Sequence, residues 1–194
     1  MRRLIATVAV LVTTTAARAE TLWEIDPAHT SVQFSVRHMM VSNVRGEFRK
    51  VAGTVHADDK DLTHSVIEAT IDVASIDTRE PKRDEDLRSP DFFAAAQYPT
   101  ITFRSKSIAK TGEGQYKVTG DLTMHGVTHE VALDVIGPTP AVKDPRGGMR
   151  AGGQATTKIN RQDYGVAWSK VMEGGGVVVG DEVSITIDAE GVKK

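Results

Sequence analysis

The sequence contains no cysteine, which excludes disulfide bonds, thiolate catalysis and cysteine-ligated metal sites. Aromatic residues are also scarce, at 5% of the 194 positions, so few bulky side chains are available to fill an interior. No apolar run in the chain reaches the roughly 20 residues that a membrane-spanning helix needs. With 24 basic against 26 acidic residues the net charge is −2, so we do not expect nucleic acid as a partner.

The N-terminal segment 1–19 has the pattern of a secretory signal peptide. An arginine pair precedes a short apolar stretch, and the Ala-Arg-Ala sequence at 17–19 matches an A-x-A cleavage site. We therefore expect cleavage before Glu20, one mature domain over residues 20–194, and a periplasmic or extracellular location in a bacterium. A retained N-terminal anchor is the alternative. Without cysteine, the mature domain must be stabilised by its core alone.

Most of the remaining sequence alternates between apolar and polar residues with a period of two, which predicts half-buried antiparallel strands. The clearest segments are 30–38, 66–75, 100–105 and 182–188. Residues 44–58 predict one long strand that bends near its glycines, and residues 148–159 predict another strand. About eight strands in sequential order favour an up-and-down barrel, with a β-sandwich as the alternative.

The segment 118–135 predicts a hairpin whose two-residue turn is the His125-Gly126 pair, because glycine adopts the positive φ that such turns require. This register puts the apolar residues on one face by pairing Met124 with Val127, Gly120 with Val131 and Val118 with Leu133. On the other face Asp121 is expected to oppose Glu130, which is unfavourable.

One helical segment interrupts the strands. Pro81 and Pro90 bracket an expected short helix, because proline is favoured in the first turn and excluded from the interior. We expect the charged residues of this helix, Arg83 among them, to form a solvent-exposed face. The alternative is that one of its arginines binds an anionic head group. Phe92 and Phe93 follow the helix, and either pack in the core or cap an apolar tunnel.

The interior of an eight-stranded barrel is either filled by side chains or holds one small ligand. Several positions that are expected to face inward carry small residues: Ala69, Gly120, Val131, Ala151, Gly153 and Ala155. Such residues leave space in a wide barrel, but a tightly wound barrel or a sandwich has none. Composition alone therefore leaves both interiors open.

The six histidines show no metal-ligand spacing. His38 and His129 continue the apolar faces of their strands near the strand ends, so we expect hydrogen-bonded histidines at a barrel mouth. Asp26, His29 and Ser31 are close in sequence, but the Asp-Pro pair before them is typical of a turn, and no G-x-S-x-G motif is present. We therefore expect no catalytic triad and no bound metal.

Five motifs occur in order along the chain: DPAHTSVQFSVRHMMVSNVRGEF, SIDTREPKRDEDLRSPDFF, YPTITFRS, GDLTMHGVTHEV and INRQDYGVAW. Together they resemble the YceI-like family of secreted bacterial proteins that bind lipids or polyisoprenoids, and the resemblance covers about residues 22–190. The family often has histidine where this sequence has Asp86, so no role of that imidazole is carried over.

The resemblance implies an all-β, lipocalin-like, eight-stranded antiparallel up-and-down barrel with a short helical insertion and an elongated apolar pore. It implies non-catalytic binding, storage or transport of a long apolar ligand in that pore. The ligand would be a polyisoprenoid, another lipid, or an isoprenoid quinone, since related domains occur beside membrane redox proteins. No cofactor is expected. The alternatives are an enzyme that acts on a lipid head group at the barrel mouth, and a structural barrel with a filled core.

The ligand-binding residues expected on this basis are Phe34, Val36, His38, Phe48, Ile71, Phe92, Phe93, Phe103, Leu122, Met124, Leu133, Trp168 and Ile185. The ligand's head group is expected at a mouth of the barrel, beside Arg83 or Arg161. The expected partners are the lipid and, transiently, a membrane or a membrane redox protein. A monomer and a homodimer are both compatible with the sequence.

Overall fold

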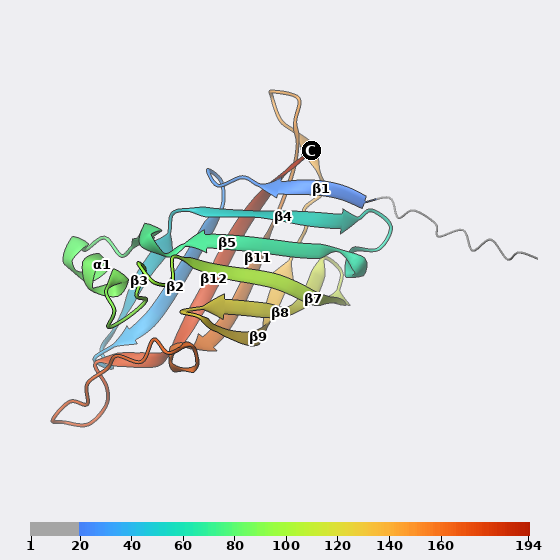
Figure 1. Ribbon diagram of the computed structural model, residues 1–194. Coiled ribbons are helices and arrows are strands. Elements are labelled where there is room, and N and C mark those ends of the chain that lie inside the picture. Colours follow the sequence, from blue (N-terminus) through green and yellow to red (C-terminus); the bar gives the residue numbers. More distant parts are fainter. Residues whose placement is uncertain (1–19) are drawn as a thin grey trace, which may run out of the picture.

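One antiparallel sheet closes on itself in the computed structural model, which describes residues 20–194 (Figure 1). Its strands are β1 (Glu20–Ile25), β2 (Ser31–His38), β3 (Ser42–Phe48), β4 (Val51–Asp58), β5 (Val66–Asp72), β6 (Ile76–Asp77), β7 (Thr100–Gly112), β8 (Gln115–Met124), β9 (Val127–Ile136), β10 (Val142–Lys143), β11 (Met149–Asn160) and β12 (Val179–Lys193). The sheet closes because β11 pairs with both β9 and β12. The expected signal peptide, residues 1–19, lies outside the described residues.

Three pairs of short strands are each the two halves of one bent wall strand. β1 and β2 both pair antiparallel with β12. On their other side, β1 pairs with β4 and β2 pairs with β3. In the same way, β4 pairs with β5 and β3 pairs with β6. With β7, β8, β9, β11 and β12 they form an eight-stranded wall in which each strand pairs with the next along the chain. The predicted up-and-down barrel is therefore confirmed, and the β-sandwich alternative is wrong.

The long strand expected over residues 44–58 does bend, but at Arg49 and Lys50 and not at a glycine. Both backbone N–H groups of the bend donate to Ser75, to its carbonyl oxygen at 3.2 Å and to its hydroxyl at 3.1 Å. Ser75 lies in the short 3₁₀ turn between β5 and β6, so the neighbouring wall strand bends at the same level.

The β8–β9 hairpin has the predicted register, in which Met124 opposes Val127, Gly120 opposes Val131 and Val118 opposes Leu133. His125 and Gly126 form its turn with φ angles of 53° and 76°. Asp121 does oppose Glu130, but Lys106 of β7 lies beside both carboxylates. Its Nζ is 2.6 Å from an oxygen of Asp121 and 3.3 Å from one of Glu130, which offsets their repulsion.

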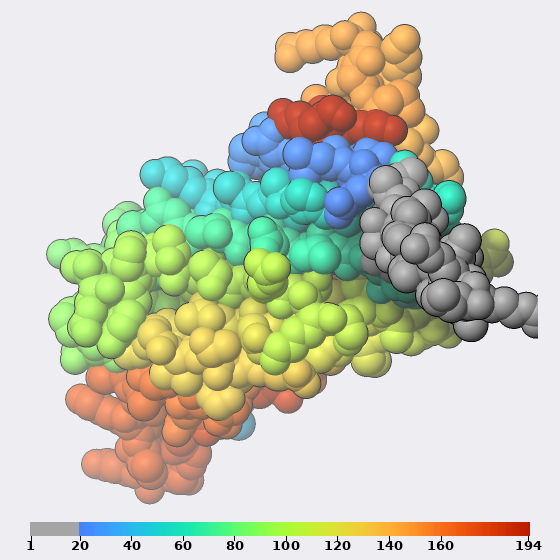
Figure 2. Space-filling view, turned by 45° about the vertical axis from the view of Figure 1, so that its right-hand side comes forward, coloured from blue at the N-terminus to red at the C-terminus, as the bar shows by residue number. Residues whose placement is uncertain are grey.

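The two ends of the barrel are built differently. We call the α1 end the one that carries α1 (Pro81–Arg88), the β2–β3 turn, the β8–β9 turn and residues 161–178. The opposite end carries residues 59–65, 113–114 and 137–148. The loop 137–148 projects at the top of Figure 2 and the loop 165–178 at its lower left, on either side of the barrel wall.

The helix α1 begins at the expected proline, and the Glu80 side chain accepts a hydrogen bond from the backbone N–H of Lys82. Asp84 is buried and accepts from both the backbone N–H and the hydroxyl of Thr78, which ties α1 to the end of β6. Across residues 20–194, no helix is long and apolar enough to cross a membrane.

The hydrophobic core is concentrated at the α1 end. Its buried members are Val32, Phe48, Val51, Val73, Ile76, Ile101, Met124 and Tyr164. The rings of Phe34 and Phe93 pack on Phe48, with centroid distances of 5.7 and 5.9 Å. Since Phe93 comes from the segment after α1, the helical insertion closes this end of the barrel with its own side chain.

Candidate functional site

The inner face of the barrel wall is apolar. Because side chains alternate along a strand, the register places one residue of each pair inside and its neighbour outside. Phe34 opposes Ile185, and Phe103 opposes Leu122. These inward side chains keep part of their surface accessible although they face into the barrel, whereas Val118 of β8 is only 1% exposed. The interior is therefore lined by apolar groups that the protein itself does not completely cover.

Glycines in the wall leave room for the aromatic rings to lie against it. A β-carbon at Gly120 would be 2.6 Å from Cζ of Phe103, and one at Gly46 would be 2.5 Å from Cζ of Phe34. Each ring therefore occupies the space in which the inward side chain of the neighbouring strand would lie. Gly120, one of the small inward residues predicted from the sequence, thus gives its space to a ring of the wall itself, and Gly46 does the same.

The interior changes character from one end to the other. At the α1 end Phe48, Phe93 and Met124 belong to the packed core. Toward the opposite end, β11 and β12 face the interior with small residues, which pair as Ala151 with Gly191 and Gly153 with Ala189, and Ala155 lies opposite the larger Ile187. The barrel is closed by large side chains at the α1 end, whereas the small residues of β11 and β12 at the other end lie beside Trp23, whose Cβ is 3.6 Å from the β-carbon position of Gly191.

The expected ligand-binding residues fall into two groups. Those that face inward from the wall are Phe34, Val36, His38, Phe48, Ile71, Phe103, Leu122, Met124, Leu133 and Ile185. Phe92, Phe93 and Trp168 come from the segments that cover the α1 end, where the rings of Phe92 and Trp168 lie 5.2 Å apart. The structure brings the set together around one interior, and ligand binding by these residues stays a prediction.

Arg83 and Arg161 both bond to the protein itself. Arg161 is only 5% exposed and donates to the carbonyl oxygens of Gly180 (2.8 Å), Val166 (2.5 Å) and Val179 (3.2 Å), so it holds the loop 165–178 against β12. Arg83 donates twice to Thr78, to its hydroxyl and its carbonyl oxygen, at 2.8 Å each. A head-group role for these two arginines stays a prediction, and their observed contacts are structural.

The wall is joined least regularly between β9 and β11, where backbone pairing spans only Gln154–Thr156 of β11. Beyond this point the Thr157 hydroxyl donates to the Ala132 carbonyl oxygen at 2.8 Å. His129 reaches the Asp163 carbonyl oxygen at 3.0 Å through Nε2, and His125 the Tyr164 carbonyl oxygen at 3.2 Å through Nδ1. The two histidines fasten the 3₁₀ turn Arg161–Tyr164 over this seam.

Two hollows have linings that mix polar and apolar groups. One of about 240 Å³ lies at the β9–β11 junction and is lined by Thr111, Gln115, Tyr116, Asp134, Val135, Ile136, Gln154 and Thr156. One of about 430 Å³ lies beside α1 and is lined by Arg49, Asp77, Arg79, Glu80, Pro81, Asp84 and Arg88. Pockets for apolar ligands are lined mainly by hydrophobic side chains, so neither hollow suits a long apolar chain.

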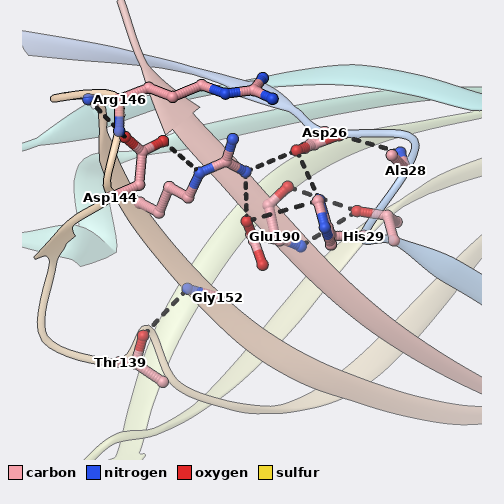
Figure 3. A network of polar contacts seen from close by, with 11 residues as sticks. Asp26, Ala28, His29, Thr139, Asp144, Arg146, Gly152 and Glu190 are labelled. Carbon is pink, nitrogen blue, oxygen red and sulfur yellow. Dashed lines mark hydrogen bonds and ion pairs between the residues drawn. The ribbon is translucent and has the colours of Figure 1, made fainter.

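A polar network on the outer surface joins the β1–β2 corner to β11 and β12 (Figure 3). Arg150 lies at its centre, with Nη1 2.6 Å from Asp26 and Nε 2.8 Å from Asp144, and it also pairs with Glu190. His29 Nδ1 is 2.9 Å from Asp26. The Arg150 guanidinium, with His29 and a backbone N–H, holds the pKa of the Asp26 carboxyl well below its usual range.

This network is not arranged for catalysis or for a metal. Ligand atoms of Asp26, His29 and Glu190 lie within 4.8 Å of one another, but Arg150 already supplies the cation between the two carboxylates. The Ser31 hydroxyl accepts a hydrogen bond from the Gln33 side chain, and within residues 20–194 no contact joins it to His29. The sequence could not show this network, because Arg150 is 124 residues from Asp26.

Comparison with known proteins identifies this architecture. Residues 23–191 match the YceI-like domain. The chain belongs to the YceI-like family. A UPF0312 protein of Staphylococcus aureus is 37% identical to this YceI-like protein over 171 residues, which cover 88% of this chain and 96% of the relative.

Solved structures of the YceI-like fold agree with this assignment. BcnA of Burkholderia cenocepacia is similar with a TM-score of 0.73 at 26% identity, over 86% of this chain and 98% of BcnA. The YCEI protein of Campylobacter jejuni has a TM-score of 0.68 at 30% identity, covering 81% and 90%. A polyisoprenoid-binding domain from Saccharophagus degradans has a TM-score of 0.65 at 16% identity, covering 89% and 98%, and so supports the fold alone. In this YceI-like protein, Asp86 is exposed on α1.

Proposed function

We propose that this YceI-like protein binds one long apolar ligand inside its barrel, a polyisoprenoid, an isoprenoid quinone or another lipid, and stores or transports it without covalent chemistry. The observation that carries the proposal is the ring of inward apolar side chains, Phe34, Phe103 and Ile185 among them, which stay partly accessible within a closed wall. The Saccharophagus degradans domain with the same fold is described as polyisoprenoid-binding, which supports the same class of ligand.

The energetics favour such a ligand. Burial of each CH₂ group contributes about 0.8 kcal/mol, so a chain of several prenyl units gains far more than the ordering of one flexible molecule costs. A free chain of this kind is nearly insoluble in water, and a barrel that covers it along its length keeps it dispersed. Selectivity would come mainly from the length and shape of the chain.

Two alternatives are less well supported. An enzyme that acts on a head group would need an acid, a base or a metal at a mouth of the barrel, whereas the Asp26–His29 pair lies on the outer surface beside Arg150. A filled structural barrel fits the α1 end, where Phe48 and Phe93 pack together. It accounts less well for the other half, where the small residues of β11 and β12 face the interior beside one large side chain, Trp23.

We also propose that the mature protein works in the periplasm as a monomer or homodimer, on the basis of the secretion pattern in residues 1–19. A carrier there must exchange its cargo with a membrane, directly or through a membrane redox protein. A surface suited to that exchange lies at the α1 end, where Met39, Met40 and Val41 are 45%, 51% and 77% exposed and Val171 is 82% exposed.

Both loops that carry these residues form one apolar tip, because the Met39 N–H donates to the Val178 carbonyl oxygen at 2.8 Å. Arg37, Arg45 and Lys170 flank the tip, and none of them pairs with a carboxylate of residues 20–194. Apolar groups that insert among lipid tails, with cations that meet anionic head groups, are typical of membrane-surface binding.

The test of the proposed function is native mass spectrometry of the protein purified from a bacterial periplasm, followed by solvent extraction. The expected result is a discrete bound mass that the solvent releases and that is identified as a prenyl or acyl lipid. Protein stripped of lipid should then take up an added prenyl quinone in a one-to-one ratio. A bare polypeptide mass, together with no uptake of added prenyl lipid or quinone, would rule out the carrier.

A further inference from the structure

The methionines of this chain differ widely in exposure. Met39 and Met40 in the turn between β2 and β3 are 45% and 51% exposed, whereas Met124 in the core is 6% exposed. Met149 and Met172 are half-buried. Because the chain has no cysteine, the methionine thioethers are its only sulfur groups and its most readily oxidised side chains. An oxidant that reaches the folded protein therefore meets Met39 and Met40 first.

These two side chains lie where two loops meet at the α1 end. The Met39 N–H donates to the Val178 carbonyl oxygen at 2.8 Å, and Arg37 donates through Nη2 to the Met40 carbonyl oxygen at 2.8 Å. Cγ of Met40 is 3.1 Å from the β-carbon position of Gly176. The backbone of the turn is thus fixed by its neighbours, while about half of each methionine side chain is presented to solvent.

The backbone of this turn is not one that methionine favours. Met39 and Met40 have φ angles of 48° and 60°, in the left-handed region that glycine and asparagine adopt most readily. Residues held in such a conformation often serve a function that the geometry of the turn does not require. Membrane contact would account for an apolar side chain here, but leucine would supply the same apolar surface. A thioether adds what leucine lacks, because it can be converted reversibly into a polar group.

We propose that Met39 and Met40 are modification sites, at which a two-electron oxidant such as hydrogen peroxide ends the membrane contact of the apolar tip. The inference rests on the proposed function, since it regulates the tip described there. The sulfur lone pair forms a bond to one peroxide oxygen, the O–O bond breaks, and the other oxygen leaves as water with the proton of the first. The thioether is oxidised to a sulfoxide and the peroxide is reduced. Methionine sulfoxide reductases restore the thioether, and two thiols become a disulfide in that step.

A sulfoxide is poorly suited to the lipid interior. Its oxygen is a hydrogen-bond acceptor, and lipid tails offer it no donor. Val41 and Val171 stay apolar after oxidation, and the cations Arg37, Arg45 and Lys170 keep their attraction to anionic head groups. We therefore expect vesicle binding to weaken by about tenfold and not to vanish.

The experiment follows oxidation and vesicle binding in the same samples. Delipidated protein is treated with hydrogen peroxide for increasing times, digested with trypsin and analysed by mass spectrometry. Trypsin releases residues 38–45 as one peptide, separate from the other methionines. Each sample is also sedimented with vesicles of phosphatidylglycerol and phosphatidylcholine. A second portion is first treated with methionine sulfoxide reductases that act on both sulfoxide epimers.

Two variants locate the effect. The double substitution Met39→Leu, Met40→Leu removes both proposed sites and keeps the tip apolar. Met149→Leu is the matched control, because Met149 is a half-buried methionine at the start of β11, at the opposite end of the barrel. Each variant is compared with itself before and after peroxide, so that any effect of leucine on the basal binding does not enter the comparison.

We expect the peptide 38–45 to gain two oxygen atoms well before the Met124 peptide gains one. The loss of vesicle binding should follow the oxidation of the peptide 38–45 and should be reversed by the reductases. Met149→Leu should lose binding as the wild type does, and the double variant should keep its own binding after peroxide.

Two outcomes would refute the modification sites and leave membrane contact intact. One is a wild type that is fully oxidised in the peptide 38–45 and still binds vesicles as before. The other is a double variant that loses binding as much as the wild type does. If the untreated wild type does not bind the vesicles, membrane contact fails and the modification sites fail with it, whereas a lipid found in the barrel by native mass spectrometry would still support the carrier.

Discussion

Nη1 of Arg150 lies 2.6 Å from Oδ2 of Asp26, and this contact joins the start of β11 to the corner between β1 and β2. The same guanidinium holds Asp144, which lies in the loop 137–148. One side chain therefore ties a projecting loop to the closure of the barrel, where β12 meets both β1 and β11.

Replacement of this arginine should loosen the opposite end of the barrel. In Arg150→Met, Asp26, Asp144 and Glu190 lose their shared cation, so we expect a melting temperature lower by several degrees and faster amide exchange in residues 137–148. The control is Arg146→Met in the same loop, because only the backbone N–H of Arg146 is bonded there. Equal melting temperatures for the two variants would contradict the role assigned to Arg150.

The network also predicts a dependence of stability on pH. Hydrogen bonds from Arg150 are the main reason why the pKa values of Asp26 and Asp144 lie below their ordinary value of 3.8. A carboxyl whose pKa is lowered by folding stabilises the fold above its ordinary pKa, and this contribution is lost as the pH falls. Melting temperatures should therefore change little between pH 7 and pH 5 on account of these groups, and fall steeply below about pH 4.

The comparison that isolates this effect is the same pH series in Arg150→Met. Without the guanidinium the two carboxyls should titrate closer to their ordinary pKa, so the difference in melting temperature between wild type and variant should shrink as the pH falls. A difference that stays constant down to pH 3 would show that Arg150 acts through packing and not through these carboxylates.

The sequence predicted what depends on neighbouring residues. The register predicted for the β8–β9 hairpin is correct for every residue pair that was named, because the alternation of apolar residues and the His125-Gly126 turn together allow only one register. The bend at Arg49 and Lys50 was placed wrongly, since it is held by Ser75, whose position follows only from the folded sheet. Short-range patterns determine a strand, whereas its curvature depends on contacts that are distant in sequence.

The polar residues of the site were the least predictable. Arg161 was expected at a barrel mouth near a ligand head group, which stays a prediction, and the sequence did not indicate that this arginine is buried with its donors on backbone carbonyls and Asp181. Tyr164, three residues later, was not predicted to join the buried core cluster. The segment INRQDYGVAW has no simple alternation, so the direction of this ring follows only from the 3₁₀ turn and its histidine contacts.

Gly120 should be required for the wall to accommodate Phe103. In Gly120→Ala the new β-carbon would lie 2.4 Å from the Arg104 carbonyl oxygen and 2.6 Å from the Phe103 ring. The strand or the ring must shift, so we expect a loss of about 1–3 kcal/mol in the free energy of unfolding and weaker binding of long apolar ligands. Gly174→Ala is the control, because nothing lies within 4 Å of its β-carbon position, and its effect should stay within about 0.5 kcal/mol. Similar unfolding curves for both variants would contradict the close approach at Gly120.

The turn formed by Met39 and Met40 at the α1 end should lower the stability of the fold and, in return, provide apolar groups for membrane contact. Met39 and Met40 form the centre of the turn between β2 and β3 with φ angles of 48° and 60°, which cost a side chain with a β-carbon about 1 kcal/mol each. Turns of this geometry strongly prefer Asn-Gly. The double substitution Met39→Asn, Met40→Gly should therefore raise the melting temperature while it removes two exposed apolar groups from the proposed membrane-binding tip.

Vesicles of phosphatidylglycerol and phosphatidylcholine, sedimented with the delipidated protein, provide the measurement. We expect the wild type to sediment with the anionic vesicles and the more stable Asn-Gly variant to lose most of this association, because its tip no longer inserts. Leu22→Ser with Val142→Ser is the control, since these exposed apolar residues lie at the opposite end and should not affect sedimentation. Undiminished sedimentation of the Asn-Gly variant would move membrane contact away from this tip. A loss only in the control would place it at the opposite end of the barrel.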